Sequence, residues 1–568
     1  MPAAAPRPTD PRHIDEALAR LRENAPRWAR APLPERITLA RSMLRGIHRT
    51  AARHVAAACE VKGIPRGSPA EGEHWLSGPY VAARFLRQLE RSMRLLHRNG
   101  NTPVGPLSET IDGRIAVRVF PPGPKDRLLF MGVTGEVHLE AGVDEAELHR
   151  SRARFHKQPF HAGKVCLVLG AGNLDGIPPT DVAYKLFNEG KVCILKMNPV
   201  NGYLGPVLED AFADAIAQGV LAIVQGGAAE GAYLAQHPAV DEIHITGSTA
   251  THDAIVWGPP GPERAARMAR NQPLLAKPIT SELGGVSPVL VVPGPWDDGR
   301  LRFQAESIAG GVTHNASFNC VAAKLLVTPR GWAERDAFLA AVEHYLALTP
   351  TRRAWYPGAH ERYRALTEGR ADVRRVGKVQ AADALPWTIV AGLDAASDDP
   401  AFQTEPFCAL LSETSVGSED PHEFLAEAVR FVNARVAGTL VAHLVVHPRT
   451  LADPSLARAV EEAIRQLRYG SVCVNVWAAY PFGFGTTPWG AYPGSTLTDV
   501  QSGIGFVHNT LMLERVEKTV IRHPARTFPK PPYFPTHRTT HALGRQMLEL
   551  EARGWRAMPG LLAAGVAG

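Results

Sequence analysis

Hydrophobic residues change their spacing along the chain of 568 residues. Over residues 13–60 and 71–97 they recur every three or four positions, which predicts helices that bury one face. The short apolar runs 114–120 and 127–133 predict strands. From Lys164 onward, apolar runs alternate with helical patterns, which predicts parallel strands joined by right-handed helical crossovers.

Two or three lobes are expected, because the chain is longer than one hydrophobic core usually serves, and the pattern indicates two of the α/β kind. The first contains strands near 164–170, 192–197, 221–227 and 241–247. The second begins after Glu282 and repeats the alternation, with a long helix at 332–347. Beyond residue 505 the chain becomes basic and rich in proline, which predicts an extended tail or arm with a short final helix.

Composition predicts a soluble, cytoplasmic protein. Its hydrophobic share of 45% and charged share of 21% are those of an ordinary globular chain. Six cysteines without a CxxC pair indicate reduced thiols. The first residues contain no apolar signal segment, and apolar runs such as 436–446 are too short to span a bilayer.

The formal net charge of +6 does not by itself indicate a partner. Arg84, Arg87, Arg91 and Arg94 share one helical face, which we interpret as solvated, the alternative being a surface for anionic partners or cofactor phosphates. No nucleic-acid-binding signature accompanies the charge, so no nucleic acid partner is expected. The histidines are scattered and form no HExxH motif, so no metal site is predicted.

Four motifs in order carry a family resemblance. They are DEIHITGST (241–249), TSELGGVSP (280–288), NASFNCVAAKLLVTP (315–329) and TEPFCALLS (404–412). Together they resemble the aldehyde dehydrogenase superfamily over roughly residues 160–510.

The resemblance implies a Rossmann-like cofactor-binding lobe, a second α/β catalytic lobe and an oligomerisation arm. It divides the chain into three parts. Residues 1–280 contain the N-terminal helices and the NAD(P)-binding domain, with a β-arm near 114–160. Residues 281–480 form the catalytic domain, and residues 481–568 form a return segment and C-terminal extension.

The catalytic residues implied by the resemblance are Cys320, Glu282 and Asn173. A thiolate is a strong nucleophile toward a carbonyl, and Cys320 lies in a polar turn ahead of an apolar strand, whereas a core cysteine lies within one. A carboxylate with a raised pKa suits the activation of water, which is the role of Glu282 unless it is a surface or capping residue. Asn173 would donate to the developing oxyanion, the alternative being a turn residue.

Cofactor-binding residues follow from the same resemblance. Gly247 and Ser248 end a strand and open a helix whose N-terminus suits a pyrophosphate. Lys196 would contact the adenosine ribose and Glu405 the nicotinamide ribose. Gly284 would let the backbone pass close to the reactive carbon and the nicotinamide. Phe407 would pack beside the nicotinamide ribose. The alternative for Lys196 is an exposed lysine at a strand end, and the alternative for Phe407 is a core aromatic residue.

The chain also departs from the family pattern. It has Ala171-Gly172-Asn173 where the family usually has Pro-Trp-Asn, so a large aromatic wall is missing. Val286 replaces the lysine that usually follows the two glycines, and another residue replaces the glutamine often found just before the cysteine. No carboxylate follows Lys196 in Met197-Asn198-Pro199-Val200, so the cofactor is expected to be NAD or NADP. These departures mark a divergent member.

An aromatic stretch at 476–494 falls where the family builds its substrate tunnel. Trp477, Phe482 and Phe484, with Trp489, are the candidate pocket residues and suit a bulky or apolar aldehyde. The alternative is that they pack the lobe or an oligomer contact.

The resulting functional hypothesis is oxidation of an aldehyde to a carboxylic acid with NAD(P)⁺, through a cysteine thiohemiacetal and thioester. Alternatives are a coenzyme A-acylating aldehyde dehydrogenase or acyl-thioester reductase, and, in another class, a non-redox thiol hydrolase or an inactive scaffold. The resemblance further implies a homodimer or homotetramer, assembled through segments near 114–133 and after 505.

Overall fold

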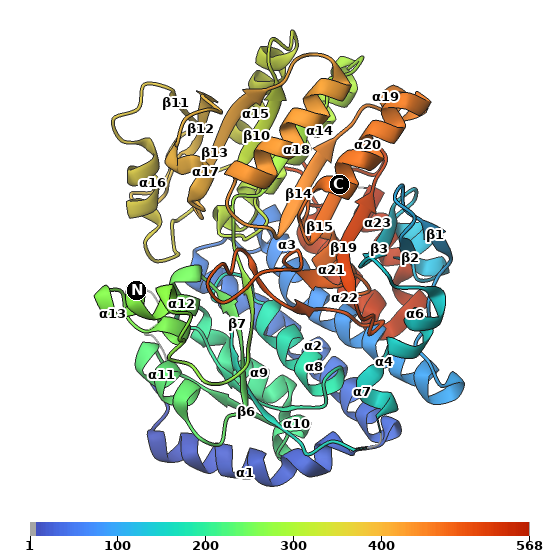
Figure 1. Ribbon diagram of the computed structural model, residues 1–568, viewed down its shortest axis with the longest axis vertical. Helices are drawn as coiled ribbons and strands as arrows, with labels where there is room; N and C mark the ends of the chain where they lie inside the picture. Colours follow the sequence, from blue (N-terminus) through green and yellow to red (C-terminus); the bar gives the residue numbers. More distant parts are fainter. Residues whose placement is uncertain (1–6, 159, 567) are drawn as a thin grey trace.

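A computed structural model describes residues 7–158, 160–566 and 568, and shows two α/β lobes with a helical layer at the N-terminus (Figure 1). That layer contains four helices and one π-helical turn. They are α1 (Pro11–Ala29), α2 (Leu33–Lys62), α3 (Pro69–Trp75), η1 (Leu76–Tyr80) and α4 (Val81–Asn99).

The first lobe is built on a six-stranded sheet in the order β17-β8-β7-β4-β5-β6. Its five longer strands run parallel, and β17 pairs antiparallel with β8. The strands are β4 (Val165–Leu169), β5 (Val192–Lys196), β6 (Leu221–Val224), β7 (Glu242–Gly247), β8 (Ile279–Leu283) and β17 (Gly503–Ile504). The helices between them are α8 (Ile177–Phe187), α9 (Gly205–Ala211), α10 (Ala213–Ala217), α11 (Ala228–Gln236), α12 (Thr249–Trp257) and α13 (Pro262–Ala269).

The second lobe is built on an eleven-stranded sheet, in the order β1-β2-β3-β19-β15-β14-β9-β10-β13-β12-β11. The strands from β19 to β12 run parallel, and antiparallel strands flank them at both ends. They are β1 (Leu107–Glu109), β2 (Ile115–Phe120), β3 (Thr134–Leu139), β9 (Pro288–Val291), β10 (Leu325–Pro329), β11 (Val373–Val376), β12 (Trp387–Leu393), β13 (Leu410–Val416), β14 (Val441–Val445), β15 (Ser471–Val474) and β19 (Val516–Arg522).

Helices cover both faces of this sheet, as a parallel sheet requires (Figure 1). They are α14 (Asp298–Thr313), α15 (Arg335–Leu348), α16 (Ala359–Thr367), α17 (Pro400–Gln403), α18 (Pro421–Arg435), α19 (Pro448–Ala452), α20 (Pro454–Gln466) and α21 (Tyr480–Phe484). The predicted α/β fold with two lobes is confirmed.

The strand predicted at 127–133 is wrong. Residues Pro124–Leu129 form helix α5, and the next strand, β3, begins at Thr134. Proline at the first helical position and Asp126 in the first turn favour a helix start here. The buried Asp126 carboxylate also lies 2.8 Å from the Arg84 guanidinium, which fixes α5 against α4.

The solvated helix face predicted for α4 is wrong at Arg84. Its side chain is only 1% exposed, and its guanidinium lies 2.9 Å from the Glu551 carboxylate, in helix α22 (Thr540–Arg553) near the end of the chain. Arg87 donates to the Glu551 carbonyl oxygen at 2.8 Å. A periodic stripe of arginine cannot reveal that a helix more than four hundred residues later in the chain packs on it.

The segment after β19 folds back onto the N-terminal helices and does not extend as a tail. A proline-rich stretch leads into α22, which is followed by α23 (Met558–Val566). A Cβ at Gly72 would overlap the backbone of Thr540, and one at Gly544 would lie 2.7 Å from the Trp75 Cβ. These glycines therefore let α3 and α22 pack at close range.

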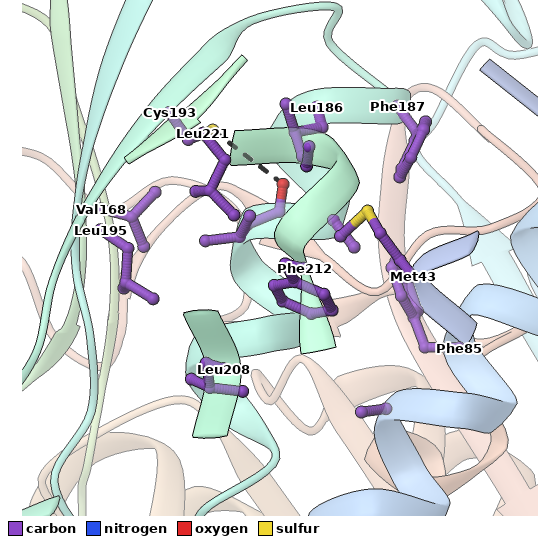
Figure 2. Packing of buried hydrophobic residues seen from close by; sticks show 14 of the residues in the cluster. Met43, Phe85, Val168, Leu186, Phe187, Cys193, Leu195, Leu208, Phe212 and Leu221 are labelled. Atoms are coloured by element: carbon purple, nitrogen blue, oxygen red, sulfur yellow. Dashed lines mark hydrogen bonds between the residues drawn. The ribbon is translucent and has the colours of Figure 1, made fainter. Parts of the chain in front are cut away.

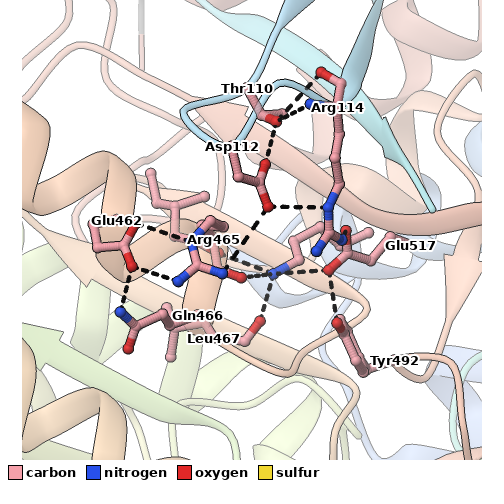
Figure 3. A network of polar contacts seen from close by, with 11 residues as sticks. Thr110, Asp112, Arg114, Glu462, Arg465, Gln466, Leu467, Tyr492 and Glu517 are labelled. Atoms are coloured by element: carbon pink, nitrogen blue, oxygen red, sulfur yellow. Dashed lines mark hydrogen bonds and ion pairs between the residues drawn. The ribbon is translucent and has the colours of Figure 1, made fainter. Parts of the chain in front are cut away.

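The predicted β-arm is attached to its own chain (Figure 3). Strand β3 pairs antiparallel with β19. In the turn between β1 and β2, the Arg114 guanidinium forms an ion pair with the Glu517 carboxylate on β19 and lies 3.0 Å from Asp112. Tyr492 donates to Glu517 at 2.6 Å. The strands expected to reach a partner thus complete the chain's own sheet.

The helical layer and the first sheet share one core (Figure 2). Met43 and Phe85 from the N-terminal helices lie in it with Val168 and Leu195 from the sheet, and Phe212 is fully buried between them. Within the described residues, no helix is both long and apolar enough to cross a membrane.

Truncating Phe212 is expected to lower the free energy of unfolding by about 3–5 kcal/mol, because it leaves a cavity in this core. Chemical denaturation of Phe212→Ala beside the wild type measures the loss. Tyr233→Ala is the control: the side chain is 40% exposed and lies outside this core, and the loss of its hydrogen bond to Asp15 is expected to cost about 1 kcal/mol. Equal stabilities of the two variants would contradict the assigned packing.

Candidate active site

A cavity of about 1210 Å³ opens between the two lobes, at the carboxyl ends of strands β4, β5 and β7. Cys320 and Glu282 both line it. So do the six residues predicted to bind a cofactor, which are Lys196, Gly247, Ser248, Gly284, Glu405 and Phe407. Ligands of open α/β sheets bind at this edge of the sheet, so the cleft is the expected place for a nucleotide.

The loop that carries Cys320 is held in an uncommon conformation. It follows α14, and Asn315, Ala316 and Ser317 have φ values of 55°, 56° and 69°. Left-handed backbone at residues other than glycine costs about 1–3 kcal/mol each. The Asn315 amide donates to the Glu73 carboxylate of α3 at 2.8 Å, which offsets part of that cost.

Glu73 is in turn clamped by Arg352, which reaches both carboxylate oxygens at 2.6 and 2.7 Å. Burial alone would raise the pKa of Glu73, but the Arg352 charge and the hydrogen bonds lower it to about 2. The clamp therefore stays ionised at neutral pH. Burial lowers the pKa of the neighbouring His314 to about 4, so this histidine is neutral there.

Cys320 and Glu282 face each other. The Cys320 Sγ lies 3.7 Å from Glu282 Oε1 and donates to it. Burial raises the pKa of the Glu282 carboxyl to about 8, and the charge of Asp181 adds to the shift. Burial and the Glu282 charge together raise the pKa of the Cys320 thiol well above its ordinary value. The thiol is therefore protonated at rest, and Glu282 is placed to receive its proton once its own carboxyl group has ionised.

Asn173 lies in the loop after β4 and is hydrogen-bonded to the cysteine loop. Its Nδ2 donates to the Phe318 carbonyl oxygen at 3.3 Å, and Asn315 Nδ2 donates to the Asn173 carbonyl oxygen at 3.0 Å. At Gly172, where the family has an aromatic residue, a Cβ would lie 2.7 Å from the Asn198 side chain. Asn198 therefore occupies the space on that side of the loop.

Lys324 is a site residue that the sequence reasoning missed. Its ammonium donates to the carbonyl oxygens of Gly285 and Cys320, each at 2.8 Å, and forms an ion pair with the Glu405 carboxylate. One buried cation thus joins the segment after Glu282, the cysteine loop and a predicted cofactor ligand. The available signal was a single charge inside the apolar run AAKLLVTP.

The wall of the interlobe cavity suits an anionic ligand. Ser248 caps the N-terminus of α12 by accepting a hydrogen bond from the Thr251 amide. Among the described residues that line the cavity, the cations are Lys196, Lys277 and Arg362, and the only carboxylates are Glu282 and Glu405. A Cβ at Gly284 would overlap the Glu405 carboxylate, so only glycine leaves room there.

A second cavity, of about 660 Å³, reaches the same pair of groups from the other side. Cys320 and Glu282 line both cavities. The second contains the predicted pocket residues Trp477, Phe482 and Phe484, and also Trp489. Five further aromatic residues that the sequence reasoning did not assign to the pocket join them, namely Tyr80, Phe130, Tyr480, Phe528 and Tyr533. No group of three or more His, Cys, Asp or Glu side chains in the described part of the chain could hold a metal ion.

The fold and the two joined cavities define a two-lobed α/β protein with a thiol and a carboxyl group in its interlobe cleft. A model of the aldehyde dehydrogenase family matches residues 182–354. Aminoacetaldehyde dehydrogenase of Pseudomonas aeruginosa is 30% identical over 308 residues, which are 51% of this chain and 54% of that protein. 4-trimethylaminobutyraldehyde dehydrogenase of Homo sapiens is 30% identical over 128 residues, 22% of this chain and 23% of that protein.

The fold agrees with these matches. The NADP-dependent glyceraldehyde-3-phosphate dehydrogenase of Bacillus halodurans, solved with NADP, has a TM-score of 0.60 and 18% identity over 90% of this chain and 91% of that chain. Residues 182–354 thus match the aldehyde dehydrogenase family, and the fold of most of the chain is similar to that of this solved structure. In the aligned segments the chain spans between about a quarter and about half of the length of the two relatives.

Replacing Lys324 by methionine is expected to lower the free energy of unfolding by about 2 kcal/mol, because Glu405 and two carbonyl oxygens lose their shared donor. Thermal denaturation measures the change. Lys277→Met removes a cation from the same cavity that donates only to the His237 carbonyl oxygen, so it is the matched control. A loss in Lys324→Met no larger than in the control would contradict the joining role of Lys324.

Proposed function

We propose that the chain oxidises an aldehyde to a carboxylic acid with NAD⁺ or NADP⁺ as hydride acceptor. The observation that carries the proposal is the 3.7 Å contact between the Cys320 thiol and the buried Glu282, at the junction of the two cavities. One cavity has the size and charge for a dinucleotide, and the other is lined by aromatic side chains.

The residues present fit a nicotinamide dinucleotide. Gly247 and Ser248, at the N-terminus of α12, would hold the pyrophosphate, Lys196 the adenosine ribose and Glu405 the nicotinamide ribose. When bound, the cofactor would accept the hydride that leaves the substrate carbon. The only carboxylates of the described lining are Glu282 and Glu405, to which we assign other roles, so none is left to bind a ribose 2′-hydroxyl or repel a 2′-phosphate, and we propose that both NAD and NADP are accepted.

The chain's own groups supply the covalent chemistry. Glu282 takes the Sγ proton as Cys320 forms a bond to the aldehyde carbon, and the Asn173 amide and the Cys320 backbone N–H donate to the oxyanion. Loss of hydride from that thiohemiacetal leaves a thioester on Cys320. After its proton has passed to solvent, Glu282 takes a proton from a water that attacks the thioester, and the acid leaves as the thiol is restored.

Glu282 also bears on the alternatives. A base in contact with the nucleophile supports release of the thioester by water over its transfer to coenzyme A. The cation-lined interlobe cavity has no use in a non-redox thiol hydrolase or an inactive scaffold. Oxidation with hydrolytic release is therefore the function we propose.

The substrate that the second cavity fits is a bulky or apolar aldehyde. Trp477 donates from its indole to the Val321 carbonyl oxygen at 2.8 Å, which fixes its ring beside the cysteine loop. The Phe484 ring stacks on Phe120 with centroids 3.6 Å apart. Rigid aromatic walls of this kind bind apolar groups at little cost in entropy.

We propose a homodimer or homotetramer as the assembled form. Strand β1 ends the eleven-stranded sheet, and no strand of the described residues pairs with its outer edge. An open edge is a template for pairing with another chain. Light scattering on the purified protein measures the mass that tests this.

The proposed activity predicts reduced cofactor when the protein meets a panel of aldehydes with NAD⁺ or NADP⁺, and none with Cys320→Ala, because the covalent intermediate cannot form. Absorbance of the reduced nicotinamide is the measurement. A strict need for coenzyme A would indicate the acylating alternative. Ester hydrolysis independent of either cofactor would indicate a thiol hydrolase, and binding of neither cofactor a scaffold.

The raised pKa of Glu282 predicts a pH dependence for thioester release. Its base form is required, so the rate is expected to rise about tenfold per pH unit toward a midpoint near the pKa of about 8 and to level off above it. Single-turnover release of acid between about pH 6 and 10 measures this. Glu282→Gln is expected to lose the midpoint and accumulate the thioester. A wild-type midpoint near the ordinary glutamate value would contradict this assignment.

A further inference from the structure

The segment after β19 has no part in the proposed chemistry, yet it forms a large part of the wall of the second cavity. Residues 523–566 run from the end of β19 through the proline-rich stretch to α22 and α23. Many of them line the cavity that reaches Cys320 and Glu282. The side chains of this C-terminal segment would therefore contact a substrate bound in the second cavity.

We propose that residues 523–566 select the substrate by its length, so that the preferred aldehydes are uncharged and carry an extended apolar body that reaches α23. This rests on the proposed aldehyde oxidation. The aldehyde carbon would lie at Cys320, the body between the aromatic residues, and the far end against the C-terminal segment.

The chemistry of this wall supports an apolar ligand. Its side chains include Pro529, Leu543, Met547, Leu561 and Leu562. Burial lowers the pKa of His537 to about 4, so its ring is neutral at neutral pH. These side chains give a charged group no partner.

Two cations of the segment, Arg526 and Lys530, line the cavity. The Lys530 ammonium donates to the Thr536 hydroxyl. The guanidinium of Arg526 lies 3.2 Å from the position of a Cβ at Gly299, in α14. The Lys530 ammonium is therefore engaged within its own segment, and the Arg526 guanidinium lies beside the start of α14.

The segment is a fixed wall. The Glu551 carboxylate lies 2.9 Å from Arg84 and 3.0 Å from Lys125. Nearer the site, the Tyr533 hydroxyl accepts a hydrogen bond from the Trp477 amide at 3.3 Å and lies 2.8 Å from the Ser307 hydroxyl. The same tyrosine therefore belongs to the C-terminal segment and to the aromatic lining, which fixes their spacing.

The outer end of the cavity carries apolar side chains into solvent. Phe528 is 78% exposed and Leu562 is 49% exposed, and both line the cavity, as do the exposed Val566, Leu128 and Met131. Exposed apolar residues gathered at one opening mark a binding site for an apolar ligand. A short, water-soluble aldehyde would not reach them.

Straight-chain aldehydes from propanal to dodecanal, with NAD⁺ or NADP⁺, test the proposal through kcat/KM. In the wild type we expect a rise of about fourfold for each added methylene until the wall is filled. In Leu562→Asp the ratio of kcat/KM for decanal to that for propanal is expected to fall about tenfold or more, because a charge meets the far end of the long substrate. Phe528→Asp, in the proline-rich stretch, should repeat the effect.

Trp555→Asp is the matched control. Trp555 lies between α22 and α23 and is 56% exposed, but it does not line the cavity. This variant should keep the wild-type ratio, and the melting temperatures of all three variants report whether each is folded. Folded Leu562→Asp and Phe528→Asp proteins with the wild-type ratio would overturn the length selection and leave aldehyde oxidation intact. Failure of the wild type with every aldehyde would instead reject the proposed function itself.

Discussion

The site exists only where the two lobes meet, and the buried ammonium of Lys324 holds that meeting together. The strand that carries Glu282 belongs to the first sheet, whereas Cys320 precedes a strand of the second. Lys324 binds the carbonyl oxygens of Gly285 and Cys320 and the carboxylate of Glu405. A buried cation is stable only when hydrogen-bond acceptors and counter-charges replace its water shell. Displacing one lobe relative to the other would break these contacts, so the arrangement tolerates little displacement.

Much of the fold could be predicted from the sequence, because buried parallel strands and amphipathic helices leave periodic patterns. The alternation of apolar runs and helical patterns after Lys164 predicted two α/β lobes. The motifs predicted Cys320, Glu282 and the cofactor-binding candidates, and the structure places them in one cleft. Helix α5 was missed, because the apolar run at 127–133 resembles a strand when its helix start at Pro124 is overlooked. Short apolar runs are ambiguous in this way.

Contacts between segments that are distant in the sequence could not be predicted, because they leave no pattern in the residues around either partner. Glu73 holds the amide of Asn315, and nothing in the helical pattern around Glu73 indicates a partner in the cysteine loop. Arg84 looked like one charge of an exposed stripe but is buried against a helix near the end of the chain. In both cases the tertiary partner determines the role, and periodicity describes only the element itself.

The bond between Arg84 and Glu551 has a consequence for the synthesis of the chain. Its two partners are 467 positions apart, and a ribosome adds about 5–20 residues per second, so Arg84 emerges tens of seconds before its partner exists. During that time the Arg84 guanidinium of α4 has only one of its two counter-charges, Asp126, because Glu551 has not yet been made. The N-terminal helical layer, and the far wall of the second cavity with it, can reach their final form only after residues 523–566 have been made.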